Sequence, residues 1–117
     1  MANKDRKYDL EERTTKFAVK IVKLLRTLPK DSINNRIFGQ LTGSAGSIGA
    51  NYREANDALG KKDFVLRLKI SRKEAKETIH WLEVLLAANP SKEKEIKVFI
   101  KESEELRNIL SAIINKV

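Results

Sequence analysis

The sequence contains no cysteine, one histidine and two prolines. The lack of cysteine excludes a disulfide framework and thiolate chemistry. No apolar run approaches the roughly 18 residues that a membrane-spanning helix requires, so we expect no membrane contact. The first ten residues are charged and polar, which does not fit the apolar segment of a signal peptide. Together these absences predict a cytoplasmic protein.

The residues that are present favour helices. Of 117 residues, 34% are charged and 41% hydrophobic, a length and balance that predict one helical domain over residues 1–117. Apolar residues recur at steps of three and four in four segments. The predicted helices cover about 9–28, 32–59, 63–89 and 91–116. Their short connections predict an all-α, antiparallel up-down-up-down four-helix bundle.

Residues with capping preferences mark the helix ends. The expected N-terminal caps are Asp9 with Glu12, Asp31 or Ser32, and Asp63. Gly60 is expected to follow the second helix in the left-handed conformation. The apolar stripe of that helix is expected to run from Ile33 to Leu59.

The second helix holds an unusual amount of glycine. The four interior glycines are Gly39, Gly43, Gly46 and Gly49. Each costs about 0.8–1 kcal/mol relative to alanine, so packing must compensate. A phosphate-cradling loop is the alternative, but neither GxGxxG nor GxxxxGK[ST] is present. The glycines therefore favour close approach of a neighbouring helix, within the subunit or across a subunit interface.

Few residues could carry catalysis or bind a metal. Glu77 and His80 form a Glu-x-x-His pair, half of the pattern found in di-iron bundles. With one histidine, the second half must come from another subunit. There is no Gly-x-Ser-x-Gly nucleophile elbow. We therefore expect no enzyme activity, no resident metal and no cofactor.

A polar group follows the seam between the second and third helices. Asn51 and Glu54 lie one helical turn apart and are expected to pair with Arg72 or Lys73. Such a group fixes the register of a bundle. A partner-contact patch is the alternative.

Basic residues give the chain a net charge of +8. Residues 1–30 hold nine Lys/Arg against four Asp/Glu, and residues 61–90 hold seven against four. The candidate phosphate contacts are Arg13, Lys16, Lys20, Lys23, Arg26, Lys30, Lys69, Lys73 and Lys76, with Lys62 beginning the third-helix stripe. If the two helices expose neighbouring faces, their stripes form one surface that binds RNA or DNA by counterion release. An ordinary solvated helix face is the alternative.

The most specific segments are Ser44–Ala55, Lys61–Phe64 and Leu68–Thr78, followed by Trp81. They resemble the bacterial four-helix-bundle proteins named for intervening sequences in 23S ribosomal RNA genes. In that family Ser-Ile-x-Ala-Asn-x-x-Glu-Ala precedes Asp-Phe and Lys-Glu-Ala-x-Glu-Thr. The matching residues are Ser47, Asn51, Glu54, Ala55, Asp63, Phe64, Glu74, Glu77 and Trp81. The resemblance covers roughly residues 8–86.

The resemblance implies a ring-like homo-oligomer, a pentamer, without established enzymatic activity. The family is also similar to accessory proteins of diversity-generating retroelements, which are basic pentameric barrels that bind nucleic acid and a reverse transcriptase. These implications and the charge predict a non-catalytic scaffold for RNA or DNA. A bundle that binds only protein is the alternative.

Overall fold

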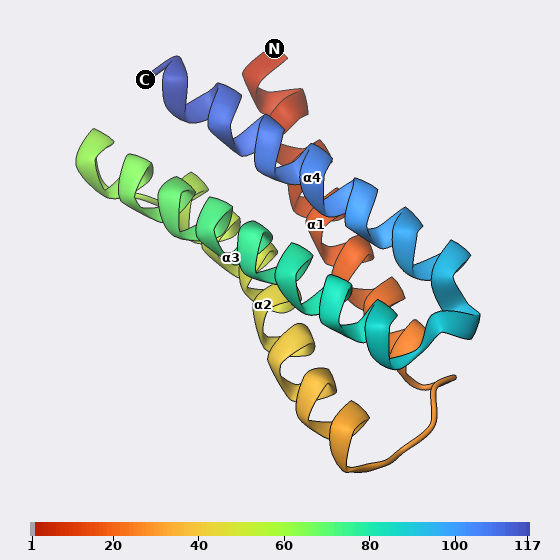
Figure 1. Ribbon diagram of the computed structural model, residues 1–117. Helices are drawn as coiled ribbons and strands as arrows, with labels where there is room; N and C mark the ends of the chain where they lie inside the picture. The colour runs from red at the N-terminus through yellow and green to blue at the C-terminus, as the bar shows by residue number, and fades with distance from the viewer. Residues whose placement is uncertain (1) are drawn as a thin grey trace.

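The computed structural model describes the backbone of residues 2–117 and the side chains of residues 9–117. Its helices are α1 (Ala2–Leu25), α2 (Ser32–Asn56), α3 (Lys61–Ala88), the short 3-10 helix η1 (Pro90–Lys92) and α4 (Glu93–Asn115). They form an elongated bundle of 44 × 22 × 20 Å (Figure 1). The predicted all-α four-helix fold is confirmed.

The order of the helices around the bundle follows their order in the chain. α2 packs against α1 and α3, and α4 packs against α3 and, more sparsely, α1. α1 and α3 therefore lie across the diagonal of the bundle and are not neighbours. Each helix is antiparallel to its neighbour in sequence because the connections are short.

Several predicted helix ends are wrong. α1 begins at Ala2, so Asp9 lies inside the helix and does not cap it. α2 ends at Asn56, three residues before the prediction, and Gly60 has an extended backbone with φ of −161°. Gly60 is the N-cap residue of α3, which moves Asp63 into the first turn. In the first turn its carboxylate still interacts favourably with the partial positive charge at the N-terminus of the helix.

The remaining helix ends differ less from the predictions. α1 ends at Leu25. Two further backbone hydrogen bonds, from Thr27 to Leu24 and from Leu28 to Leu25, continue the chain in a tighter turn up to the buried Leu28. Asp31 caps α2 as expected, because its Oδ1 accepts a bond of 2.8 Å from the backbone N of Asn34. η1 separates α3 from α4, so α4 begins at Glu93.

Small hydroxyl side chains fill the seam between α2 and α3. Ser71 Oγ donates to the backbone oxygen of Ile48 at 2.7 Å, and Thr78 Oγ1 donates to Ser44 Oγ at 3.0 Å. Among the described side chains, every buried nitrogen and oxygen has a partner. The buried hydroxyls therefore join the two helices without the cost of an unsatisfied polar group.

Both ends of the predicted α2 stripe are wrong. Ile33 is 65% exposed, and Leu59 is fully exposed because the helix ends before it. Asn34 points inward instead and exchanges two amide hydrogen bonds with Asn89, at 2.9 and 3.0 Å. This buried pair joins the start of α2 to the end of α3.

The four glycines of α2 divide into two groups. A Cβ on Gly49 would lie 2.7 Å from Thr14 Oγ1, so this glycine permits the close approach of α1 that the sequence predicted. Around Gly39, Gly43 and Gly46, a Cβ would meet nothing within 4 Å. The packing prediction is confirmed within the chain only at Gly49. None of the helices described here is long and apolar enough to cross a membrane.

Candidate nucleic-acid interface

Arg13, the first candidate phosphate contact on α1, is held by α4. Its Nε and Nη2 donate to the two carboxylate oxygens of Glu102 at 2.8 and 2.7 Å. Nη2 also reaches Glu105 at 3.0 Å. This bidentate contact is among the strongest charge-assisted hydrogen bonds in proteins. It raises the pKa of Arg13 and leaves its guanidinium little capacity for phosphate.

Lys16 and Lys20 lie near the same acidic residues, Glu102 and Glu105. They line a groove of about 560 Å³ between α1 and α4. Its other lining residues are Asp9, Glu12, Arg13, Phe17, Val98, Phe99, Lys101, Glu102 and Glu105. The rings of Phe17 and Phe99 lie 6.1 Å apart at an angle of 58°. Because both charge signs line the groove, it is a poor site for a polyanion.

The ion pair between Arg13 and Glu102 predicts a pH dependence of stability. Arg13 lowers the pKa of Glu102 below its usual 4.5, mainly through the hydrogen bond and against the opposing effect of burial. The contribution, about 1 kcal/mol, is therefore present above pH 4.5 and is lost as the pH falls toward the folded-state value. Urea titrations should show Glu102→Gln less stable than wild type at neutral pH and equally stable under strong acid. Glu104→Gln, an exposed change on the same helix, is the control. A pH-independent deficit in Glu102→Gln would contradict this origin.

The rest of the predicted α1 stripe is open to solvent. Lys23 is exposed on the last turn of α1, and Arg26 and Lys30 are exposed in the segment that follows the helix. None of the three has an ion pair among the described residues. These cations are available to an external partner.

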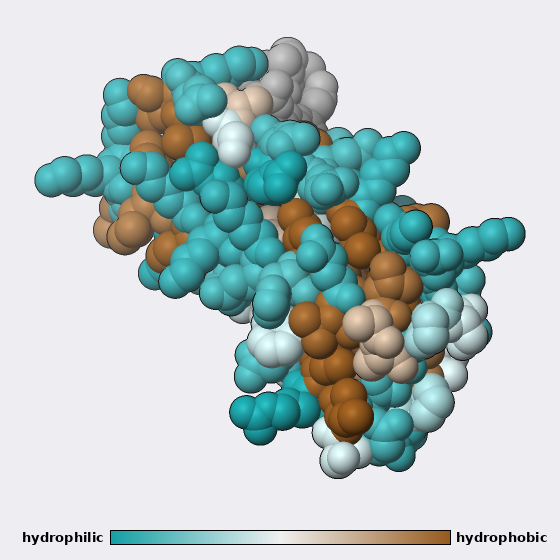
Figure 2. Space-filling view, in the orientation of Figure 1, coloured by the Kyte–Doolittle hydropathy of each residue, from teal (hydrophilic) through white to brown (hydrophobic). Residues whose placement is uncertain are grey.

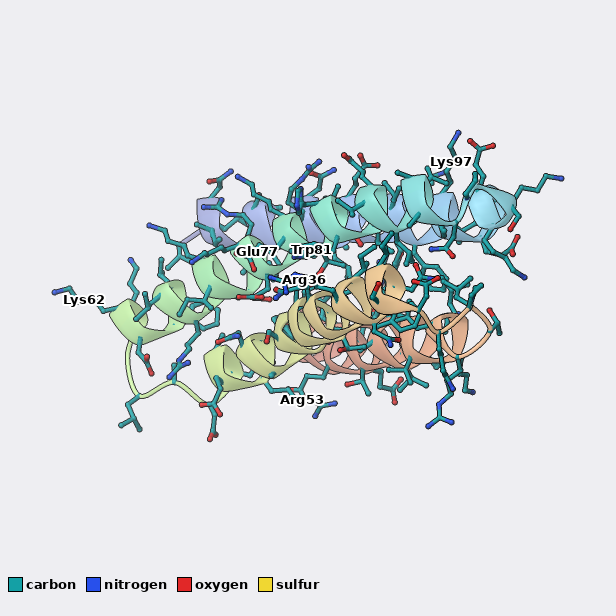
Figure 3. All side chains as sticks on the ribbon, turned by 60° about the horizontal axis from the view of Figure 1, so that its bottom comes forward. Arg36, Arg53, Lys62, Glu77, Trp81 and Lys97 are labelled. Carbon is teal, nitrogen blue, oxygen red and sulfur yellow. The ribbon has the colours of Figure 1, made fainter. Side chains whose placement is uncertain are left out.

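The lysines of the α3 stripe are open to solvent along its whole length. The exposed lysines of this stripe are Lys62, Lys69, Lys73 and Lys76. From Lys62 to Lys76 the stripe extends about 21 Å, given the rise of a helix per residue. No ion pair holds any of them among the described residues. Figure 2 shows hydrophilic residues along much of the face that α3 and α4 present, with a hydrophobic strip crossing it, and Figure 3 shows Lys62 extending away from the helix.

One arginine that the sequence did not assign to the interface lies at the α3–α4 seam. Arg72 of α3 donates to Ser111 Oγ of α4 at 3.4 Å. It follows Lys69 by three positions and precedes Lys76 by four, so it lies beside the lysine stripe on the same helix. This spacing is the signal by which the sequence could have identified it.

The two basic stripes do not form one surface. α1 and α3 lie across the diagonal of the bundle and are not neighbours. The condition for a merged surface, neighbouring exposed faces of these two helices, is therefore not met. α3 alone carries the more continuous candidate interface.

The polar group at the α2–α3 seam has different partners from those expected. Asn51 donates to the backbone oxygen of Ser47 at 2.9 Å and accepts from Arg67 Nη1 at 3.4 Å. Glu54 is exposed and forms no ion pair with Arg72 or Lys73 in the part of the chain that is described. The expected pairing is wrong because Arg67 contacts Asn51 across the seam, whereas Arg72 contacts Ser111 of α4.

The other motif residues divide between the core and the surface. Ala55 is buried, and Phe64 and Trp81 pack at the edge of the core. Glu74 is half-buried, and burial followed by the charge of Glu77 raises the pKa of its carboxyl group. Asp63 is exposed and lies 3.9 Å from Arg67.

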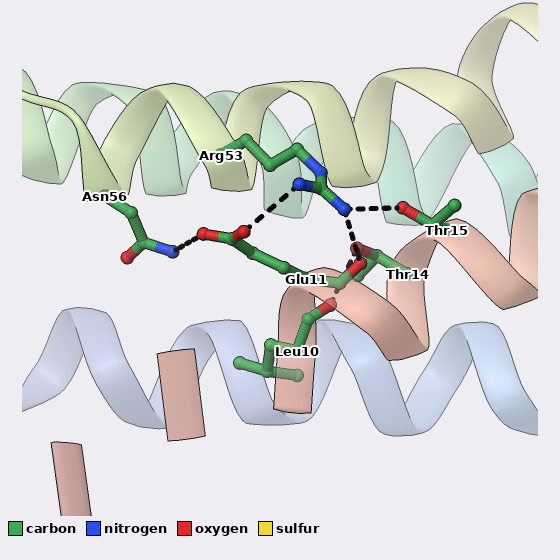
Figure 4. A network of polar contacts seen from close by, with 6 residues as sticks. All are labelled: Leu10, Glu11, Thr14, Thr15, Arg53 and Asn56. Carbon is green, nitrogen blue, oxygen red and sulfur yellow. Dashed lines mark hydrogen bonds and ion pairs between the residues drawn. The ribbon is translucent and has the colours of Figure 1, made fainter. Parts of the chain in front are cut away.

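A second polar network joins α1 to α2 (Figure 4). Glu11 accepts from Arg53 at 3.1 Å and from Asn56 at 2.9 Å. Arg53 also donates to Thr15 Oγ1 at 3.1 Å. Arg53 therefore has a structural role between the helices, although it lies within the most specific sequence motif.

Among the described residues, the Glu77–His80 pair has no further metal-binding side chains grouped with it. Both residues are exposed, and the ring of His80 lies 4.9 Å from that of Trp81 in an edge-on arrangement. Within residues 9–117, no three histidine, cysteine or acidic side chains are grouped so that they could hold a metal ion.

Comparisons with known proteins agree with this architecture. Residues 6–112 match the family model of the 23S rRNA-intervening sequence protein. A crystal structure of a protein of unknown function from the S23 ribosomal protein family of Bacteroides thetaiotaomicron is 33% identical, with a TM-score of 0.81. The match covers 93% of this chain and 97% of that one. No functionally curated protein matches the sequence. The chain thus belongs to the 23S rRNA-intervening sequence protein family.

Proposed function

We propose that the protein is a non-catalytic, homo-oligomeric scaffold of the cytoplasm that binds the backbone of RNA or DNA. The observation that carries this proposal is the α3 stripe of Lys62, Lys69, Lys73 and Lys76, whose charges are exposed and lack internal ion pairs. Lysines spread along about 21 Å of helix match the extended line of charge that a nucleic-acid strand presents. Assembly as a pentamer is part of the proposal.

The type of contact sets the expected selectivity. Lysine binds phosphate as a point charge and does not read the edges of bases. Aromatic residues, which stack on unpaired bases, make up only 6% of the sequence. Binding is therefore expected to depend weakly on sequence and strongly on salt.

A matched pair of triple variants tests which surface binds. Lys69→Gln/Lys73→Gln/Lys76→Gln should weaken binding to an RNA duplex by about tenfold or more at low salt, because three phosphate contacts are lost. The control, Lys92→Gln/Lys94→Gln/Lys97→Gln, removes the same charge from the end of η1 and the start of α4. There Lys92 and Lys97 already pair with Glu95 and Glu93.

Filter-binding titrations against RNA and DNA duplexes of one sequence measure both effects. Equal losses in the two triple variants would show that net charge alone matters and would refute the α3 surface. Failure of the wild type to bind at low salt would refute nucleic-acid binding altogether. In that case a bundle that binds only protein, such as a reverse transcriptase, is the remaining proposal.

A further inference from the structure

A leucine interrupts the lysine stripe of α3. The stripe consists of Lys62, Lys69, Lys73 and Lys76, and Leu66 lies between the first two of them. With Leu66 included, the positions follow one another at steps of four, three, four and three, so this leucine lies on the same side of the helix as the lysines. Its side chain is 55% exposed. A ligand that lies along the stripe therefore also meets an apolar side chain.

Leu66 also borders an open hollow at the start of α3. The hollow has a volume of about 420 Å³, and its lining residues are Lys61, Lys62, Val65, Leu66 and Lys69. This volume falls within the range of small-ligand sites, about 300–1,000 Å³. Val65 is half-buried. Each of the two apolar residues lies one helical turn from a lysine on either side, so the hollow combines an apolar centre with a cationic rim.

The positive charge around the hollow is not compensated within the chain. Lys61, Lys62 and Lys69 are exposed, and none has an ion pair among the described residues. Asp63, the acid in the same turn of α3, does not line the hollow and lies 3.9 Å from Arg67 instead. The hollow therefore suits a ligand that carries negative charge together with an apolar group.

A nucleic-acid strand with unpaired nucleotides offers both. A duplex stacks the faces of its bases inside and presents phosphate and sugar outside, so its backbone offers no apolar partner to Leu66. An unpaired base exposes an apolar face, which proteins hold against aromatic or apolar side chains. Continuity with the stripe favours this ligand, since Lys62 and Lys69 belong to both the stripe and the hollow.

We propose that the hollow holds an unpaired base of a nucleic acid whose phosphates lie on the α3 lysines. The inference rests on the proposed function and names its preferred substrate as nucleic acid with unpaired nucleotides. Lys61, which the stripe does not contain, adds a phosphate contact at this end. Val65 and Leu66 have no hydrogen-bonding side chain with which to read the edge of a base, so any base should fit.

Three RNA duplexes of one sequence test this inference by filter binding. One is blunt, one has a short single-stranded extension with ordinary bases, and one has the same extension made of abasic nucleotides. The two extended duplexes carry the same charge, so a difference in affinity between them reports contact with a base. Wild type should bind the extension with bases about fivefold more tightly than the abasic one, at the lower end of the range for stacking on an aromatic ring.

Substitutions of the leucine separate the hollow from the stripe. Leu66→Gln should abolish the preference for bases and leave the affinity for the blunt duplex unchanged, because it removes no charge and glutamine is nearly as good a helix former as leucine. Leu66→Phe should enlarge the preference, since an aromatic ring stacks on a base. Val98→Gln is the matched control, because Val98 is 66% exposed on α4 and does not line the hollow. This control should keep the wild-type preference.

The outcomes distinguish this inference from the proposed function. Equal affinity of wild type for the two extended duplexes would overturn the inference and leave the proposed function intact, and an acidic protein segment would then be the better ligand for the hollow. A preference that Leu66→Gln retains would also overturn it, because the contact with bases would lie elsewhere. A wild type that binds none of the three duplexes would refute the proposed function and this inference with it.

Discussion

Replacing Leu82 with alanine is expected to lower the free energy of unfolding by about 3 kcal/mol. Leu82 lies on α3, on the same buried side as Thr78, and is fully buried. Removing its branched end leaves a cavity that rigid helices on either side cannot close. A loss of this size is a large part of the stability of a small domain, so urea unfolding should show a clear shift of the midpoint.

The matched control is the same substitution at Leu66, more than four turns away on the same helix. Leu66→Ala removes equally many atoms from a side chain that is 55% exposed. Measured on dilute protein, it should change the free energy of unfolding by less than about 0.5 kcal/mol. Equal losses at the two positions would contradict the assignment of Leu82 to the core.

Replacing Gly49 with leucine should destabilise the fold by about 3 kcal/mol. The first added atom would already lie 2.7 Å from Thr14 Oγ1 and 3.1 Å from its Cβ, so α1 must move away from α2. Such a movement also strains the network in which Glu11 joins Arg53 and Asn56. Thermal unfolding followed by circular dichroism measures the effect.

Gly46→Leu is the control, because a side chain there meets nothing within 4 Å. On dilute, monomeric protein it should raise stability by about 0.8 kcal/mol through helix propensity alone. The two substitutions, one helical turn apart, should therefore have opposite signs. Destabilisation by both would mean that the outer surface of α2 is covered within the chain.

The periodicity of apolar residues predicted the fold well. Phe17, Ile21 and Leu24 on α1, like most of the buried positions on α3 and α4, follow steps of three and four, and the structure buries them. Helix ends were harder to predict because a cap depends on backbone geometry as well as on residue type. Asp63 has the preference of a cap residue, but the extended backbone of Gly60 lets the helix begin two residues before it.

The candidate site could be predicted only as positions on single helices. The sequence identified the lysines of α1 and α3, but the acids that pair with Arg13 lie 89 and 92 positions further along the chain. Separation of the two stripes follows from topology, because first and third helices are diagonal in an up-down-up-down bundle. The partners in the polar seam were predicted wrongly for a similar reason, since which of Arg67, Arg72 and Lys73 faces Asn51 depends on the rotation of α3 about its axis.

The salt dependence of RNA and DNA binding tests the central claim most directly. If the lysines from Lys62 to Lys76 contact phosphate, log K for duplex DNA should fall with log salt at a slope of about −3 to −4 per chain. Lys69→Gln/Lys73→Gln/Lys76→Gln should reduce that slope to about −1, because only Lys62 remains. A slope that the triple variant leaves unchanged, or wild-type binding that is insensitive to salt, would contradict backbone recognition by α3.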